Sequence, residues 1–148
     1  MTLMTENRET RLLALDYGAK RIGVALSDPL MTFAYPHITI NNDNKIWNEL
    51  DKLIAEKNIS KIILGYPFRE DGKPTALSNE ITEFKKKIEK RYNLEVLFWD
   101  ERYTSSIATE MMILSNNKKS KRKDKGIVDR NAAAIILQEY LNGLKLKD

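Results

Sequence analysis

Three acidic positions in this sequence fall where a strand or a helix is expected to end or begin. Asp16 ends a short apolar run, Asp100 ends another and is followed directly by Glu101, and Asp129 opens the last amphipathic segment. In open α/β sheets, ligands gather beyond the carboxyl ends of the strands. Carboxylates gathered there repel one another unless a cation neutralises them. The pattern therefore predicts a site for divalent metal ions.

The residue types available in the chain restrict which metals this site would bind. The sequence has no cysteine and one histidine, His37, which leaves oxygen ligands from carboxylates as the main donors. Such ligands favour hard cations, and we expect Mg²⁺ or Mn²⁺. Two such ions about 4 Å apart activate a water molecule, stabilise a leaving oxygen and clamp a scissile phosphate. The chemistry that this predicts is hydrolysis of a phosphodiester bond.

Each acid also has an ordinary structural interpretation. Asp16 is alternatively the first polar residue of a turn, and Asp129 is alternatively a helix N-cap or a first-turn acid that the helix dipole favours. Asp100 and Glu101 are alternatively members of a surface ion-pair network with Arg102 or lysine side chains. No single acid decides between these interpretations, and the prediction depends on all three positions together.

Basic residues near these acids predict contacts with the phosphates of a nucleic acid. Lys20 and Arg21 follow Asp16, and Arg102 follows Asp100. Lysine meets a phosphate as a point charge and arginine as a bidentate fork. A basic loop at residues 116–125 is a further candidate for the phosphate backbone, with a solvated loop as the alternative. Its predicted contacts are Lys118, Lys119, Lys121, Arg122 and Lys123.

Tyrosines also lie beside the expected site. Tyr17, Tyr66 and Tyr103 each stand next to one of the predicted strand ends or follow it closely. Stacking on the bases of a nucleic acid is one interpretation of these side chains. Tyrosines at strand ends are commonly structural, and we do not count these three among the expected contacts.

The hydrophobic pattern predicts the elements that must position these residues. Runs of apolar residues predict strands, and apolar positions at helical spacing predict helices. Strands are expected at residues 11–16, 21–27, 32–40, 61–64 and 94–99, and helices at 44–57, 75–91, 105–115 and 128–141. This order predicts an α/β domain with a mixed five-stranded sheet, in which a three-stranded antiparallel meander adjoins two parallel strands and helices cover both faces.

Composition and charge restrict the class of protein. The chain has 148 residues, of which 42% are hydrophobic and 31% charged, which is typical of one globular domain. Residues 1–10 are polar and are expected to form a disordered leader before a single domain at 11–143. Neither a signal peptide nor a membrane-spanning run is recognisable, so a cytoplasmic location is expected. The net charge of +4 and the isoelectric point near 9.2 lean toward polyanionic partners.

Four segments of the sequence resemble the motifs of the YqgF family, also called RuvX, and they occur in the family's order. They are LALDYGAKRIGVALSD at 13–28, ILGYPFREDG at 63–72, DERYTS at 100–105 and VDRNAAAIILQEYL at 128–141. The resemblance implies a ribonuclease-H-like fold and a divalent-metal nuclease that matures the 5′ end of the small-subunit (16S) ribosomal RNA precursor in bacteria. Another role proposed for such proteins is resolution of branched DNA, the Holliday junction. The partner would be that RNA or branched DNA, and the protein a monomer or a homodimer.

On the positions that match the family's motifs, the resemblance implies that Asp16, Asp100 and Asp129 bind the metal, with Glu101 as the substitute for Asp100. One departure concerns Gly65, because ribonuclease-H-like enzymes place a carboxylate at the end of the fourth strand. Either the fifth strand supplies this acid, or the site binds metal more weakly.

Two other classes of protein remain as alternatives to a nuclease. The fragment Asp16-Tyr17-Gly18 also fits the strand-end Asp-x-Gly of actin-like ATPases, although these close two domains around a nucleotide and 148 residues supply one. The other alternative is a ribosome-assembly factor that binds nucleic acid without catalysis, and Gly65 is the residue that favours it.

Overall fold

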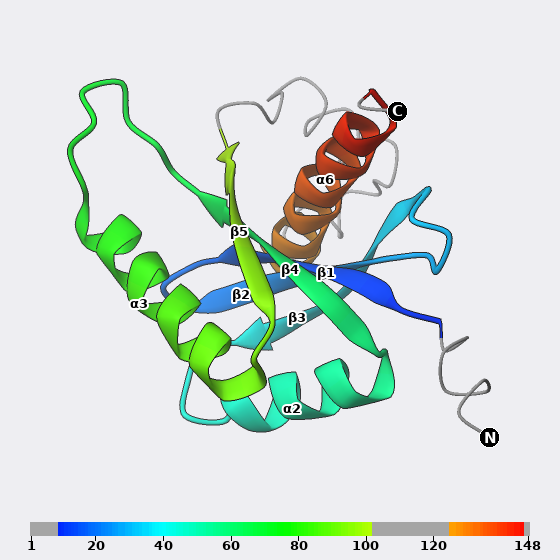
Figure 1. Ribbon diagram of the computed structural model, residues 1–148. Helices are drawn as coiled ribbons and strands as arrows, with labels where there is room; N and C mark the ends of the chain where they lie inside the picture. The colour runs from blue at the N-terminus through cyan, green and yellow to red at the C-terminus, as the bar shows by residue number, and fades with distance from the viewer. Residues whose placement is uncertain (1–8, 102–124, 147–148) are drawn as a thin grey trace.

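Five strands form one mixed sheet in the computed structural model, which describes residues 9–101 and 125–146 (Figure 1). The order across the sheet is β3-β2-β1-β4-β5, in which β1 to β3 are antiparallel neighbours and β1, β4 and β5 run parallel. The sheet confirms the predicted antiparallel meander beside two parallel strands. The strands are β1 (Arg11–Tyr17), β2 (Arg21–Ser27), β3 (Ala34–Asn41), β4 (Ile59–Tyr66) and β5 (Glu95–Asp100).

Helices cover both faces of this sheet, as the sequence predicts. The helices are α2 (Ile46–Glu56), α3 (Ala76–Tyr92) and α6 (Lys125–Leu146). Figure 1 shows α2 and α3 along one side of the sheet and α6 on the other. We call these the α3 face and the α6 face. The arrangement is that of a ribonuclease-H-like domain.

Alternation along the strands divides the core between the two faces. In β1, Leu13 and Leu15 pack on the α3 face, whereas Leu12 and Ala14 pack on the α6 face. All four are buried because β1 is the central strand and is covered on both sides. Burying a leucine side chain stabilises a fold by about 1.5–3 kcal/mol. The continuous apolar run in β1 therefore fixes the strand at the centre, with Asp16 at its end.

Local signals set the ends of α3. The hydroxyl of Thr75 accepts a hydrogen bond from the backbone N–H of Ser78 at 3.0 Å, and the Ser78 hydroxyl accepts one from the N–H of Thr75 at 2.7 Å. This reciprocal capping box satisfies two N–H groups that a helix start leaves without partners. At the other end, Asn93 adopts a left-handed conformation with φ of 53°, which terminates the helix.

Most predicted elements lie within two residues of the observed ones, and the main difference is in the last helix. The helix predicted over 128–141 extends over Lys125–Leu146, so Asp129 lies inside α6 rather than at its first residue. The predicted helix at 105–115 and most of the predicted leader lie outside the described residues. Within the described ranges, none of the helices combines the length and the apolarity that crossing a membrane requires.

Candidate nuclease site

Three parallel strands end at one edge of the sheet, which we call the carboxyl edge. β1 ends at Tyr17, β4 at Tyr66 and β5 at Asp100. Strand alternation places Asp16 on the same face as Leu12 and Ala14, the α6 face. Asp16 thus lies at the end of the central strand, under the helix that carries Asp129.

Glu101, rather than Asp100, is the acid from β5 that lies beside Asp16. In β5, Phe98 packs on the α3 face and Trp99 on the α6 face, so alternation turns Asp100 toward the α3 face, in register with Tyr66. Glu101 is the next residue, and its carboxyl is hydrogen-bonded to that of Asp16. The structure therefore brings together Asp16 and Glu101 and leaves Asp100 on the other side of the sheet.

Gly65 makes the space that the Glu101 carboxyl occupies. A β-carbon at position 65 would lie 2.7 Å from Oε1 of Glu101 and 2.9 Å from Cδ1 of Ile136 in α6. Both distances are shorter than an ordinary van der Waals contact, so a side chain at this position would displace the carboxyl. Glu101, which follows β5, therefore occupies the space that a side chain at the end of β4 would need. This explains why β4 ends without an acid when Glu101 supplies one.

A second glycine brings α6 close to Asp16 from the other side. Gly23 in β2 pairs in register with Asp16, and a β-carbon there would lie 2.0 Å from the backbone oxygen of Asp129. Only glycine permits this approach of the helix backbone to the sheet. Ala133 and Ala134, which are buried on the α6 face, continue the close contact along the helix. Asp16 is thus flanked by two strand positions without side chains, one beside each of the other acids.

Asp129 is held by an ion pair with a residue of β2. Nε of Arg21 donates a hydrogen bond to Oδ2 of Asp129 at 2.8 Å, and the side chains are 33% and 23% exposed. The contact uses Nε alone, so the two terminal Nη groups of the guanidinium are not required for it. Because Asp129 is an interior residue of α6, the alternative interpretation as an N-cap is wrong.

The electrostatics of the site reflect the crowding of its acids. Burial raises the pKa of Asp16 well above its ordinary value of 3.8, and the negative charges of Glu101 and Asp129 raise it further. Burial also raises the pKa of Glu101, as does the charge of Asp100, while the hydrogen bond with Asp16 lowers it. Two carboxyls in contact cannot both ionise at low cost without a nearby positive charge.

Among the residues that it describes, the structure does not bring the other predicted metal-binding and phosphate-binding residues together with Asp16 and Glu101. In the conformation described for 9–101 and 125–146, no three acidic side chains lie close enough together to hold a metal ion, and Asp129 is paired with Arg21. Lys20 is exposed at the tip of the β1–β2 turn. Arg102, Tyr103 and the basic loop with Lys118, Lys119, Lys121, Arg122 and Lys123 lie outside the described residues.

The sequence contains a signal for the grouping of the two acids with their neighbours, and none for Gly23. Period-two alternation groups Asp16 with Leu12 and Ala14, and Glu101 with Leu97 and Trp99, but only the structure shows that both sets lie on the α6 face. The role of Gly23 depends on the position of a helix more than a hundred residues later. That contact is not visible in any local pattern.

The sequence profile of one family matches nearly the whole chain. The RuvX profile, described as Holliday junction resolvase, matches residues 10–143. The chain belongs to the RuvX family.

A RuvX relative from Caldicellulosiruptor bescii is 42% identical over 136 residues, which cover 89% of this chain and 96% of the relative. One from Salinibacter ruber is 37% identical and covers 95% and 98%. Both bear the name "Putative pre-16S rRNA nuclease". The prediction that this RuvX chain is a nuclease is confirmed at the level of the enzyme class.

Solved structures of resolvases confirm the fold of this RuvX chain. The fowlpox virus resolvase, solved in complex with Holliday junction DNA, aligns with a TM-score of 0.58 at 16% identity and covers 91% of this chain and 99% of its own. RuvC from Thermus thermophilus aligns with a TM-score of 0.59 at 8% identity, with 92% and 96% covered. At such low identity the similarity establishes the ribonuclease-H-like fold alone.

Proposed function

We propose that this protein is a divalent-metal-dependent nuclease that hydrolyses phosphodiester bonds in the 5′ region of pre-16S ribosomal RNA in the cytoplasm. The observation that carries the proposal is the contact between Asp16 and Glu101 at the carboxyl edge of a ribonuclease-H-like sheet. Support for the substrate comes from the names of the relatives, which cover nearly the full chain. The chain itself supplies the acids and the basic residues that such a reaction needs.

The residues at the carboxyl edge fit a hard divalent cation. All candidate ligands are carboxylate oxygens, which Mg²⁺ and Mn²⁺ prefer. The raised pKa values of Asp16 and Glu101 express the cost of placing two buried carboxyls together, and a cation between them would remove this cost. When bound, such an ion supplies Lewis acidity and lowers the pKa of a coordinated water molecule.

Each residue then has a distinct part in the proposed reaction. Asp16 and Glu101 would hold such an ion at the ends of β1 and β5. Asp129, which the structure pairs with Arg21, would supply a third carboxylate to such an ion on turning away from Arg21. The guanidinium of Arg21 then binds a phosphate of the substrate strand with its two Nη groups.

Cleavage of an RNA precursor tests this proposal. The parent and Asp16→Asn are incubated with a 5′-extended 16S rRNA fragment and Mg²⁺ or Mn²⁺. The variant should cleave roughly a hundredfold more slowly or worse, since a preorganised charge at the reacting centre is lost. Asp43→Asn is the matched control, because Asp43 is an exposed acid that follows β3 at the same edge. Equal rates for the parent and Asp16→Asn would contradict the proposal.

A second substrate follows from the description of the family. The RuvX profile is described as a Holliday junction resolvase, so a four-way DNA junction is the alternative substrate. The same parent and variant are assayed on both substrates under identical metal concentrations. Faster cleavage of the junction than of the RNA precursor would make branched DNA the preferred substrate while leaving the roles of the acids unchanged.

A further inference from the structure

Three aromatic rings form a continuous column at the end of β4. The centroid of the Tyr66 ring lies 4.5 Å from that of Phe98 in β5 and 4.4 Å from that of Phe68. The planes are tilted by 41° and 55°, within the range of favourable aromatic contacts. The column therefore extends from the α3 face of the sheet to the loop that follows β4.

The two ends of the column differ. At the inner end, Nζ of Lys85 in α3 lies 5.5 Å from the centroid of the Phe98 ring, so a cation covers that side. At the outer end, Phe68 is 40% exposed. Tyr66 and Phe98 are partly buried against the core, whereas Phe68 presents ring surface to solvent.

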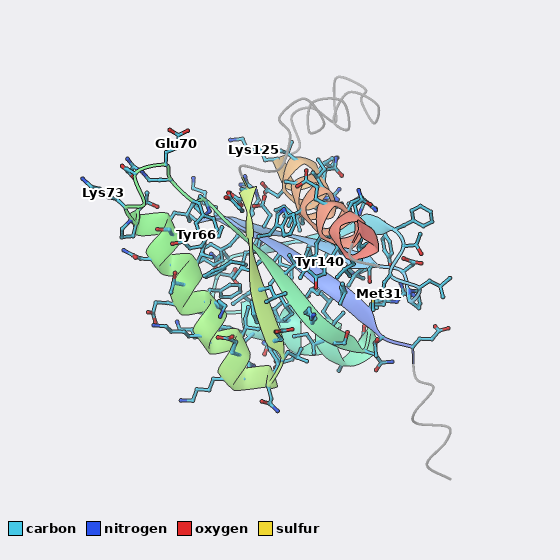
Figure 2. All side chains as sticks on the ribbon, turned by 45° about the horizontal axis from the view of Figure 1, so that its top comes forward. Met31, Tyr66, Glu70, Lys73, Lys125 and Tyr140 are labelled. Carbon is cyan, nitrogen blue, oxygen red and sulfur yellow. The ribbon has the colours of Figure 1, made fainter. Side chains whose placement is uncertain are left out.

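The loop that carries Phe68 is held by its own hydrogen bonds. The N–H of Phe68 donates to the backbone oxygen of Tyr66 at 3.0 Å. The guanidinium of Arg69 donates to both carboxylate oxygens of Asp71, at 3.1 and 2.7 Å, and Oδ1 of Asp71 also accepts the N–H of Lys73. Figure 2 shows Glu70 and Lys73 pointing outward from this loop, with Tyr66 at its base. The exposed ring is thus presented on an ordered support.

The position of Phe68 connects this ring to the acids at the carboxyl edge. Phe68 is three residues beyond Gly65, over which the Glu101 carboxyl lies. Three residues of extended chain span at most roughly 11 Å. The column lies on the α3 face and the acids on the α6 face, so a nucleic-acid strand with a phosphate at Asp16 and Glu101 would cross the carboxyl edge to place a neighbouring base at the Phe68 ring.

We infer that Phe68 is a stacking platform for an unpaired base next to the scissile phosphate, an inference that rests on the proposed nuclease function. A base has an apolar π-face that a ring of this kind binds without regard to sequence. Bases in a duplex already stack on one another, so the platform selects strands that are unpaired at this position. The substrate class is consequently single-stranded nucleic acid, or a duplex with a splayed end, at the cleavage point.

Binding of a fluorescent RNA in the presence of a chelator tests this inference separately from catalysis. The probe is a single-stranded oligoribonucleotide that contains 2-aminopurine, whose fluorescence falls when it stacks on an aromatic ring. The same strand annealed to its complement serves as the paired probe. The variants are Phe68→Ala, Phe68→Leu, which keeps an apolar contact with Tyr66, and Phe68→Trp. Phe33→Leu is the matched control, since Phe33 is 65% exposed at the opposite edge of the sheet.

The expected result is that Phe68→Ala weakens binding of the single strand by about 5-fold to 150-fold, the range for loss of one base–aromatic stack. Quenching is lost in Phe68→Ala and Phe68→Leu and retained in Phe68→Trp, while the control and the paired probe change little. Unchanged affinity and quenching in Phe68→Leu, or equal losses on both probes, would overturn the inference.

A parallel cleavage assay separates failure of this inference from failure of the proposed function. If the parent cleaves RNA and the Phe68 variants bind and cleave normally, the platform is wrong and the nuclease site stands. If the parent binds and quenches the probe through Phe68 but cleaves neither substrate, the base site stands and the nuclease proposal fails. Absence of any RNA binding by the parent would overturn both.

Discussion

Replacing Gly65 with alanine tests the geometry of the site with a single methyl group. The added β-carbon would lie 2.7 Å from Oε1 of Glu101, which is about 0.7 Å closer than an ordinary contact of 3.4 Å. It would also lie 2.9 Å from Cδ1 of Ile136, so the added methyl group presses on a side chain of α6 as well. The least costly response is movement of the flexible Glu101 side chain away from Asp16. A misplacement approaching 1 Å lowers catalytic rates by roughly a hundredfold.

Stability should respond less than activity in this variant. Overpacking of a core position costs about 1–3 kcal/mol, and the mobile end of a glutamate absorbs part of this strain. Gly143→Ala is the matched control, because Gly143 lies in α6 and the added β-carbon would meet nothing within 4 Å beyond its own stretch of helix. That change should leave cleavage unaltered and stabilise the helix by about 0.5–1 kcal/mol. Rates are measured on the RNA precursor and stabilities by urea unfolding. Cleavage by Gly65→Ala at the parent's rate would refute the placement of Glu101.

Two further predictions concern the charges of the site. Because burial raises the pKa of Asp16, its protonated form favours the folded state at pH below 3.8, and this contribution is lost as the pH rises through the raised value. Asp16→Asn should therefore unfold at a higher temperature than the parent at neutral pH in metal-free buffer. The difference should narrow as the pH falls toward 4, and a difference independent of pH would exclude this cause. For Arg21→Ala, the slope of log affinity for RNA against log salt should fall by about one, since one phosphate contact is lost. The same variant should lose about 1 kcal/mol or less of stability with the partly buried ion pair to Asp129, and an unchanged salt slope would assign Arg21 a purely structural role.

The mixed sheet and the central place of its first strand could be predicted because the apolar pattern of each strand agrees with its position in the fold. The unbroken apolar run before Asp16 is typical of a central strand covered on both faces, and β1 occupies that place. The hairpin that joins β1 to β2 requires only a short polar turn. The boundaries predicted for β4 shifted by two residues at each end, because Ser60 and Gly65 interrupt the apolar run of a strand that extends from Ile59 to Tyr66.

The choice between Asp100 and Glu101 could be made only from the structure. Both residues follow the same apolar run, and a shift of one residue moves a side chain to the opposite face of a sheet. The structure settles which carboxyl faces Asp16 because Trp99 is seen to pack under α6 and Gly65 leaves the neighbouring space open. The ring of Phe68 was also missed, since its significance depends on contact with Tyr66 and Phe98 rather than on sequence spacing.

Binding of Mn²⁺ in the absence of nucleic acid tests the pairing of Asp16 with Glu101 most directly. Affinity is measured by electron paramagnetic resonance of free Mn²⁺ for the parent, Glu101→Gln and Asp100→Asn, with folding checked by circular dichroism. We predict that Glu101→Gln weakens binding strongly while Asp100→Asn, whose side chain is directed to the α3 face, binds nearly as the parent does. Loss of binding in Asp100→Asn together with its retention in Glu101→Gln would contradict the site described above.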